Sequence, residues 1–181
     1  VQLQLGIFYT ARGDSPSAEA AYREAIYLNP QLIPALLNLA DLLRSQAREN
    51  EARKILLQAL AIAPQQGATL HALGLLETRS ANPELALDYL GRAAALETMG
   101  TRHRFVYAIA LHDLGQPQNA VNALLALLRQ TPRNEEALLA LTNYSAELGQ
   151  ADKAQRYAGK LLEIAPKNTS YQTLYKQLST N

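Results

Sequence analysis

The chain repeats itself with a period of 34 residues. One alanine recurs at this spacing, at Ala18, Ala52, Ala86, Ala120 and Ala154. Proline follows the same period at Pro30, Pro64, Pro132 and Pro166, and Thr98 stands in the place of the missing proline. Several columns with one shared period favour an array of stacked repeats over a bundle of unrelated helices.

Each repeat is predicted to contain two amphipathic helices. Between residues 33 and 46, apolar residues recur at i, i+3, i+4 and i+7, namely Leu36, Leu39, Ala40 and Leu43. Residues 51–63 have the same spacing at Ala52, Ile55, Leu56 and Ala59. This spacing places the apolar side chains on one helix face. A single helix pair cannot bury such a face alone, so we expect stacked pairs to share a continuous core.

Glycine and proline mark the turn inside each repeat. The turn column holds Gly13, Gly115 and Gly149, with Ala47 and Ala81 at the equivalent positions. Glycine tolerates the left-handed backbone that commonly ends a helix. The second helices are expected to begin near Pro16, Pro83 and Pro117, where a missing N–H costs nothing. Ser15 and Asn82 are the expected N-caps of two of them.

The two ends of the chain differ. After Pro166, apolar residues recur with helical spacing at Tyr171, Leu174, Tyr175 and Leu178, and all residues between them are polar. This pattern predicts a capping helix over 169–179 that is apolar only toward the last repeat. The segment "VQLQLG" at the start has no such cap. We therefore expect further repeats or another domain before Val1, or self-association through this uncapped edge.

The repeat resembles the tetratricopeptide repeat (TPR) family over nearly the whole chain. The first repeat carries the family pattern best, with Leu5, Gly6, Tyr9, Ala18, Tyr22, Ala25 and Pro30. Departures occur at Glu77, Thr98, Thr142 and Ser145. The resemblance implies an all-α, right-handed α-solenoid with five repeats at about 1–32, 33–66, 67–100, 101–134 and 135–168. Together with the capping helix they are expected to form one domain over 1–181.

In this family the first helices line a concave groove that usually binds a peptide or partner protein. By that resemblance we expect the groove to be lined by Leu37, Asn38, Asp41, Arg44, His71, Leu75, Thr78, Arg79, Arg102, Phe105, Ile109, His112 and Asn143. Several are apolar, which indicates a contact surface. Alternatively, the capping helix or a neighbouring copy fills the groove. The columns that grip chaperone tails in some relatives match only at Asn38, so that ligand is not expected.

Composition excludes several other functions. Seventeen basic and sixteen acidic residues give a net charge of +1, which argues against a nucleic-acid partner. There is no cysteine, so disulfides, thiolate metal sites and cysteine nucleophiles are excluded. The segment "GDSPS" at 13–17 lacks the preceding strand that an esterase nucleophile needs. His103 and His112 lie on opposite sides of one predicted helix. We therefore expect no enzyme activity, metal or cofactor, and no membrane insertion.

Two functions remain open from the sequence. The favoured one is a non-enzymatic scaffold that binds a protein or peptide in the groove, as part of a larger chain or complex. The alternative is a structural spacer or self-association segment. The segments "HALGLLETRS" and "RHRFVYAIALHDLG" are also similar to TPR tails of bacterial multihaem cytochrome c proteins. That weaker resemblance implies a periplasmic location, whereas a cytoplasmic one is the default for a TPR protein.

Overall fold

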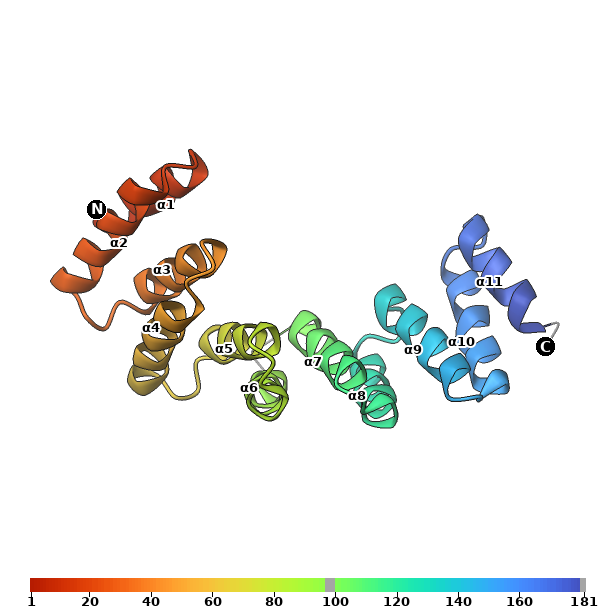
Figure 1. The fold of residues 1–181 in the computed structure, drawn as a ribbon. Coiled ribbons are helices and arrows are strands. Elements are labelled where there is room, and N and C mark those ends of the chain that lie inside the picture. Colours follow the sequence, from red (N-terminus) through yellow and green to blue (C-terminus); the bar gives the residue numbers. More distant parts are fainter. Residues whose placement is uncertain (97–99, 180–181) are drawn as a thin grey trace. The chain divides into compact units, whose positions relative to one another are not determined.

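A computed structural model describes residues 1–96 and 100–179, and these residues are entirely helical apart from turns (Figure 1). The helices are α1 (Gln2–Ala11), α2 (Ser15–Leu28), α3 (Ile33–Ser45), α4 (Glu49–Ile62), α5 (Gly67–Arg79), α6 (Pro83–Ala95), α7 (Thr101–Asp113), α8 (Pro117–Gln130), α9 (Glu135–Glu147), α10 (Ala151–Ile164) and α11 (Thr169–Ser179). The predicted all-α fold is confirmed. Thr98 lies outside the described residues. No helix of the described ranges has both the length and the apolar composition to cross a bilayer.

The helices form consecutive pairs that belong to two compact units. Unit 1 is Val1–Thr98 and contains the pairs α1–α2, α3–α4 and α5–α6. Unit 2 is Met99–Asn181 and contains α7–α8, α9–α10 and the single helix α11. Within the units, the second helix of a pair packs against the next first helix, as α2 does on α3 and α10 on α11. We describe each unit separately, and the expected single domain stays a prediction.

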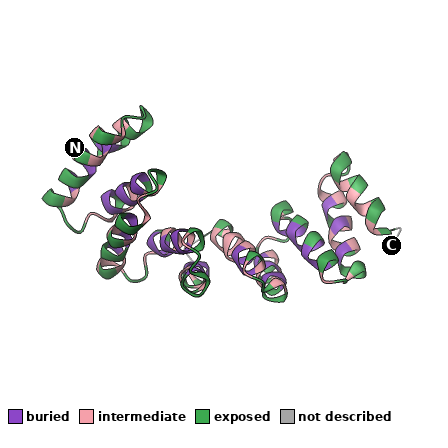
Figure 2. Cartoon of the chain, viewed as in Figure 1, coloured by how far each residue is buried: buried purple, intermediate pink, exposed green. Residues whose placement is uncertain are grey.

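The repeated alanine lies at the centre of every helix pair. All five members of the column are fully buried, with 0% exposure, and Figure 2 shows how the buried residues gather on one side of the helices. Glycine allows an even closer approach in two pairs. A Cβ at Gly6 would lie 2.3 Å from the Tyr22 ring, and one at Gly74 would lie 2.5 Å from Leu90. The small residues therefore set the distance between the two helices.

The turn inside each repeat has the same left-handed residue and the same hydrogen bonds. The φ angle is positive at Gly13, Gly115 and Gly149, and also at Ala47 (59°) and Ala81 (56°). In every repeat the next residue donates its N–H to the carbonyl five residues earlier, as Asn82 does to Glu77 at 2.9 Å. This is the Schellman arrangement, which satisfies the last carbonyls of the first helix. The left-handed backbone expected at this column is confirmed, even where the residue is alanine.

The N-caps differ partly from expectation. Ser15 is the first residue of α2, and the cap is Asp14, whose carboxylate accepts a hydrogen bond from the N–H of Ser17 at 3.2 Å. The prediction of Ser15 was therefore wrong by one residue, because the turn ends at Asp14. Asn82 does occupy the N-cap position of α6, but its side chain makes no capping bond. It donates instead to the carboxylate of Glu77 at 2.7 Å.

Glu77, which departs from the family pattern, forms a buried ion pair. Its side chain is only 2% exposed, and Arg53 of α4 donates to its carboxylate at 2.6 and 3.1 Å. The hydrogen bonds from Arg53 lower the pKa of Glu77 and outweigh burial, which raises it; Asn82 also lowers it. The equivalent positions in two other repeats hold apolar Leu43 and Leu111, which are buried. A polar group is tolerated here because its partners satisfy it.

The terminal helix packs as the sequence predicts. In α11, only Tyr171, Leu174, Tyr175 and Leu178 are partly buried among the described residues of the helix, and the rest are exposed. The Tyr175 ring lies against α10, 3.6 Å from where a Cβ of Gly159 would be. Helix α11 begins 34 residues after α9, so it occupies the place of a sixth first helix.

Substituting Ala81 by glycine is expected to stabilise the protein. Alanine in the left-handed conformation costs about 1–2 kcal/mol, and glycine removes this cost. The greater freedom of glycine in the unfolded chain lowers the resulting gain in stability by about 0.5–1 kcal/mol. The free energy of unfolding in urea, followed by circular dichroism, should rise by about 0.5–1 kcal/mol. Ala20→Gly, at an exposed position within α2, is the control and should lower it by about 1 kcal/mol. A loss of stability in Ala81→Gly would contradict the strain argument.

Removing Arg53 is expected to destabilise the protein by about 3 kcal/mol, because Glu77 then remains buried without its counter-charge. The double variant Arg53→Met, Glu77→Leu should recover most of that loss, since leucine occupies the equivalent buried position elsewhere in the chain. Urea unfolding measures both. Arg92→Met breaks the exposed Asp88–Arg92 pair and is the matched control, with an effect below about 0.5 kcal/mol. If Arg53→Met and the control Arg92→Met lost the same free energy of unfolding, burial of the Arg53–Glu77 pair would not matter.

Candidate partner-binding groove

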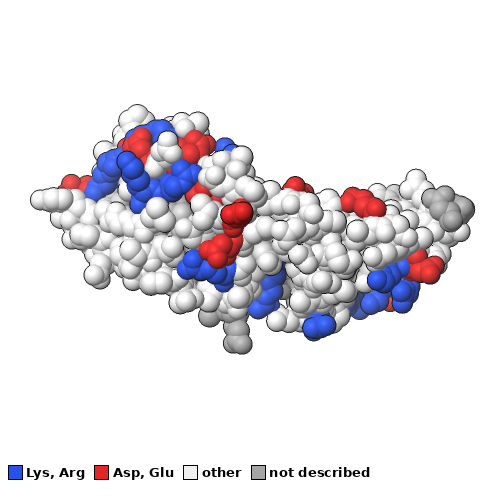
Figure 3. All heavy atoms as spheres, turned by 60° about the horizontal axis from the view of Figure 1, so that its bottom comes forward, with Lys and Arg blue, Asp and Glu red and all other residues white. Residues whose placement is uncertain are grey.

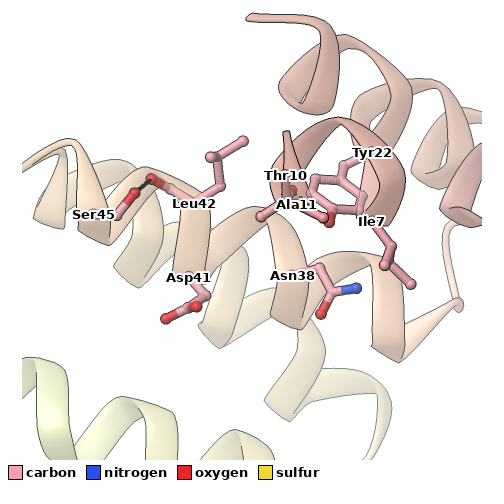
Figure 4. A pocket seen from close by; sticks show the side chains of 8 residues that line it. All are labelled: Ile7, Thr10, Ala11, Tyr22, Asn38, Asp41, Leu42 and Ser45. Atoms are coloured by element: carbon pink, nitrogen blue, oxygen red, sulfur yellow. Dashed lines mark hydrogen bonds between the residues drawn. The ribbon is translucent and has the colours of Figure 1, made fainter. Parts of the chain in front are cut away.

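The first helices of unit 1 leave a hollow between α1 and α3 (Figure 4). Its volume is about 410 Å³, within the usual range for ligand sites. Eight residues line it: Ile7, Thr10, Ala11, Tyr22, Asn38, Asp41, Leu42 and Ser45. Two hydrogen bonds fix its walls, from Ser45 Oγ to the carbonyl of Leu42 at 2.7 Å and between the Thr10 and Tyr22 hydroxyls at 3.0 Å. The hollow is therefore a formed feature of the surface.

A second hollow, of about 290 Å³, lies between α3 and α5. It is lined by Leu37, Asn38, Ala40, Asp41, Arg44, Leu56, Ala68, His71, Ala72 and Leu75. Asn38 and Asp41 line both hollows, so the two adjoin across α3. We call the combined surface the α1–α3–α5 groove. Six of the residues expected from the sequence line it: Leu37, Asn38, Asp41, Arg44, His71 and Leu75.

Helical periodicity explains why these side chains point into the groove. On α3, Leu37, Asp41 and Arg44 follow one another at i, i+4 and i+7 and share one face. The adjacent face holds Leu36, Leu39 and Leu43, which have 0% exposure and form the core. Packing therefore uses one face of each first helix and leaves another free for the groove.

The groove combines apolar side chains with an unused amide and an exposed carboxylate. No described residue hydrogen-bonds to the side chain of Asn38, which points from α3 into the hollow (Figure 4). Asp41 pairs with Arg44 three residues later, as expected, but its side chain is 71% exposed. An ion pair this exposed contributes little to stability. The amide and the carboxylate are thus available to a ligand.

Two expected residues on α5 lie outside the groove. Thr78 and Arg79 are exposed at the end of that helix and are not among the residues that line either hollow. The hydroxyl of Thr78 donates to the carbonyl of Gly74 at 2.9 Å. Ile7 and Thr10 of α1 line the groove but were not among the expected residues, although they stand one period before Asp41 and Arg44. The period itself would have identified them.

Unit 2 has a hollow of its own, about 510 Å³ in volume, between α9 and α11. It is lined by Leu139, Asn143, Thr169, Ser170, Tyr171, Thr173, Leu174 and Gln177. Asn143 is therefore the expected residue that the structure places in a hollow of this unit. The capping helix, which the alternative expectation placed inside the groove, forms one wall of this hollow. Phe105 and Ile109 are half-buried on α7, and Arg102 is exposed there.

His112 ties two first helices of unit 2 together. Its Nε2 lies 2.6 Å from a carboxylate oxygen of Glu147 on α9, and its Nδ1 lies 3.3 Å from Asp113. The imidazole also stacks on the Tyr144 ring, with centroids 3.8 Å apart. Burial lowers the pKa of His112, but the hydrogen bonds to Glu147 and Asp113 outweigh it and leave the pKa raised. Burial raises the pKa of Tyr144 to about 12.

Some charged side chains elsewhere form ion pairs. Figure 3 shows them in small groups separated by wide uncharged areas on the face it displays. In unit 1, Arg48 bridges Glu19 at 2.6 Å and Glu51 at 2.7 Å, and so joins α2 to the start of α4. Among the described residues there is no group of three His, Asp or Glu side chains suited to hold a metal ion.

The contact of His112 with Glu147 is expected to make stability depend on pH. The raised pKa means that the contribution is present below about pH 6.5 and is lost as the pH rises through the folded-state pKa. The difference in melting temperature between wild type and His112→Gln should therefore be largest near about pH 5.5. It should fall by about pH 8.5 to a constant part, which reflects the lost stacking on Tyr144. Glu147 is largely exposed, so the effect stays below about 1 kcal/mol. Arg44→Gln, which removes a permanent charge, should show no such pH dependence.

Comparisons with known proteins agree with this architecture. Sequence models of the tetratricopeptide repeat match residues 111–178 and also residues 1–32 and 33–66. The latter two ranges have the bounds of the first two predicted repeats. Comparison with curated proteins gave no match.

Several solved structures have the same fold. The MamA protein superposes with a TM-score of 0.79 at 22% identity, over 94% of this chain and 93% of MamA. YrrB, described as a TPR protein with an unusual peptide-binding site, gives 0.74 at 22% identity, over 97% of this chain and 90% of YrrB. PilF of Pseudomonas aeruginosa gives 0.77 at 19% identity, over 99% and 82%. None of these similarities supports the resemblance to multihaem cytochrome tails. From its repeat matches and its paired helices, the chain belongs to the tetratricopeptide repeat family.

Proposed function

We propose that this chain is a non-enzymatic scaffold that binds an extended peptide segment of a partner protein in the α1–α3–α5 groove. A TPR fold supports protein–protein interaction in general. The observation that carries the finer proposal is that two adjoining hollows share Asn38 and Asp41. The peptide-binding site of YrrB, a protein of the same fold, supports it by analogy.

The side chains of the groove favour a particular kind of peptide. Ile7, Leu37 and Leu75 provide apolar contacts for the side chains of the ligand. The Asn38 amide can donate to a peptide carbonyl and accept from a peptide N–H, as the main chain of an extended segment requires. Asp41 favours a basic residue in the ligand, next to the apolar residues of the ligand. The ion pair with this residue would replace the weak pair between Asp41 and Arg44. The proposed partner is thus a peptide that carries apolar residues and a basic residue.

A structural or self-association role remains the second candidate. The exposed apolar residues of α1 favour it. The absence of a nucleic-acid partner stays a prediction, supported by the near balance of acidic and basic residues.

Selection from a random displayed peptide library tests the groove. We expect wild-type protein to enrich peptides with apolar and basic residues. Asn38→Ala should lower the affinity for the selected peptides about tenfold, because one hydrogen-bonding group is lost. Leu37→Glu with Leu75→Glu should abolish binding, because it places charges on the apolar walls. Titration calorimetry with the selected peptides measures each effect.

Two controls locate the site. Leu85→Glu adds a charge at a leucine of α6 that is 48% exposed and outside the groove, and it should leave binding unchanged. Phe105→Glu with Ile109→Glu changes unit 2 and should also leave it unchanged. Binding lost in the unit 2 variant but kept in the Leu37, Leu75 variant would place the site in unit 2 and overturn the proposal.

A further inference from the structure

Helix α10 of unit 2 carries three exposed cations on one face. Lys153, Arg156 and Lys160 follow one another at i, i+3 and i+7, so their side chains lie on the same side of the helix. We call these three residues the α10 basic stripe. The opposite side of the helix holds Ala154 and Ala158, which are fully buried. The stripe therefore points away from the core of unit 2.

The exposure of this face recurs along the array, but its charge does not. The three columns of the stripe are also exposed in α4, α6 and α8, each of which has helices of the chain before and after it. In α2, α4, α6 and α8 these columns hold at most one cation each, Lys54 in α4 and Arg92 in α6. The packing of a repeat therefore does not require three cations at these columns.

The cations of the stripe are not used in ion pairs within the chain. Arginines of unit 1 pair with carboxylates on their own or on a neighbouring helix. Lys153 instead donates to the side-chain amide oxygen of Gln150 at 2.9 Å, and Arg156 donates to the main-chain carbonyl of Asp152 at 3.2 Å. Within residues 1–96 and 100–179, no carboxylate lies at ion-pair distance from the stripe. Its positive charge is thus available to a partner.

Two hollows lie beside the stripe. One, of about 360 Å³, is lined in part by Lys153 and Arg156 at the start of α10. The other, of about 250 Å³, is lined in part by Lys160 together with Arg133, an exposed cation of the turn before α9. Ile164 adds apolar surface to the second hollow. Side chains of a partner can therefore enter beside the cations.

The carboxylates near the stripe distinguish between classes of anionic partner. Asp152 and Glu163 are exposed, and each lines one of the two hollows. An anionic bilayer or a nucleic-acid backbone presents many closely spaced negative charges, which would also face these carboxylates and be repelled by them. A peptide can place its carboxylates opposite the cations alone. The arrangement therefore favours a peptide over a membrane or a nucleic acid.

We propose that the α10 basic stripe binds an acidic segment of a partner protein, whose carboxylates pair with Lys153, Arg156 and Lys160. This site is separate from the α1–α3–α5 groove, because all of its residues belong to unit 2 and to a second helix. The two sites select opposite charges, since Asp41 in the groove favours a basic residue. The chain thus has separate surfaces for two different partner segments.

Fluorescence anisotropy with a labelled, alanine-rich helical peptide tests the proposal. The peptide carries glutamates at i, i+3 and i+7, which span about 10 Å as the stripe does. A second peptide carries glutamines at these positions. Wild type should bind the glutamate peptide only, and raising NaCl from about 0.05 M to about 0.5 M should weaken binding, because salt screens exposed charges. Lys153→Glu with Arg156→Glu and Lys160→Glu should lower the affinity at least about tenfold.

Two control variants show whether binding depends on the stripe. Lys54→Glu with Arg79→Glu and Arg12→Glu makes the same change in net charge at exposed residues of unit 1, and it should bind as wild type does. Leu37→Glu with Leu75→Glu changes the α1–α3–α5 groove and should also leave this binding unchanged. Far-ultraviolet circular dichroism checks that each variant is folded.

Several results would overturn the proposal. Equal losses in the stripe variant and in the charge-matched control would show that binding follows net charge alone. Equal binding of the glutamine peptide, or no binding of the glutamate peptide at about 0.05 M NaCl, would also contradict it. Phosphatidylserine vesicles and a single-stranded RNA oligonucleotide are measured in parallel. If either bound through the stripe while the glutamate peptide did not, the surface would recognise a membrane or RNA instead.

Discussion

The close approach of two helices at small side chains is the contact on which the rest of this structure depends. In every pair a fully buried alanine, such as Ala52 or Ala120, lies between the helices. Gly6 and Gly74 have no room for a Cβ against Tyr22 and Leu90. Once each pair is locked at this distance, a first helix has one side on its partner and another on the preceding second helix. Only its remaining side is left to meet a ligand.

This division explains which columns vary along the chain. The packing column is alanine in all five repeats, whereas the groove column that holds Asp41 holds Ile7 and Leu75 in the neighbouring repeats of unit 1. A change in the first column alters the distance between helices and the whole stack. A change in the second alters only the surface offered to a partner. The fold can therefore be kept while the chemistry of the groove changes from repeat to repeat.

Much of the fold could be predicted from the sequence, because its signals are periodic and local. Helix pairs, the terminal helix and the left-handed turns follow from the 34-residue spacing, even at Ala47 and Ala81. The surroundings of Glu77 could not be predicted in this way. Its partner Arg53 lies on another helix, and no local spacing connects the two. The cap at Asp14 was missed because the end of a turn depends on backbone hydrogen bonds that the sequence does not display.

The periodic signal also explains why several of the expected residues line the same surface, although the groove itself stays a prediction. Periodicity placed Leu37, Asp41 and Leu75 on one face, and the structure brings them into adjoining hollows. It could not tell where along α5 the hollow ends, so Thr78 and Arg79 were included. Nor could it decide between α11 filling the groove, which was the alternative expectation, and α11 forming a wall of the unit 2 hollow. Where a surface is hollowed depends on side-chain packing between helices and not on the pattern of one helix.

The pair between Arg53 and Glu77 also bears on how an array of similar repeats avoids assembling in the wrong order. Similar repeats carry the hazard that one stacks on a wrong neighbour during folding. The column of Arg53 holds Glu19 one period earlier and Leu87 one period later. If α2 took the place of α4 against α5, Glu77 would face another carboxylate, and if α6 took that place, it would face an apolar side chain. Of these three helices, only α4 has a cation, Arg53, at this column to pair with the buried carboxylate of Glu77. The pair therefore favours α4 over α2 and α6 as the neighbour of α5.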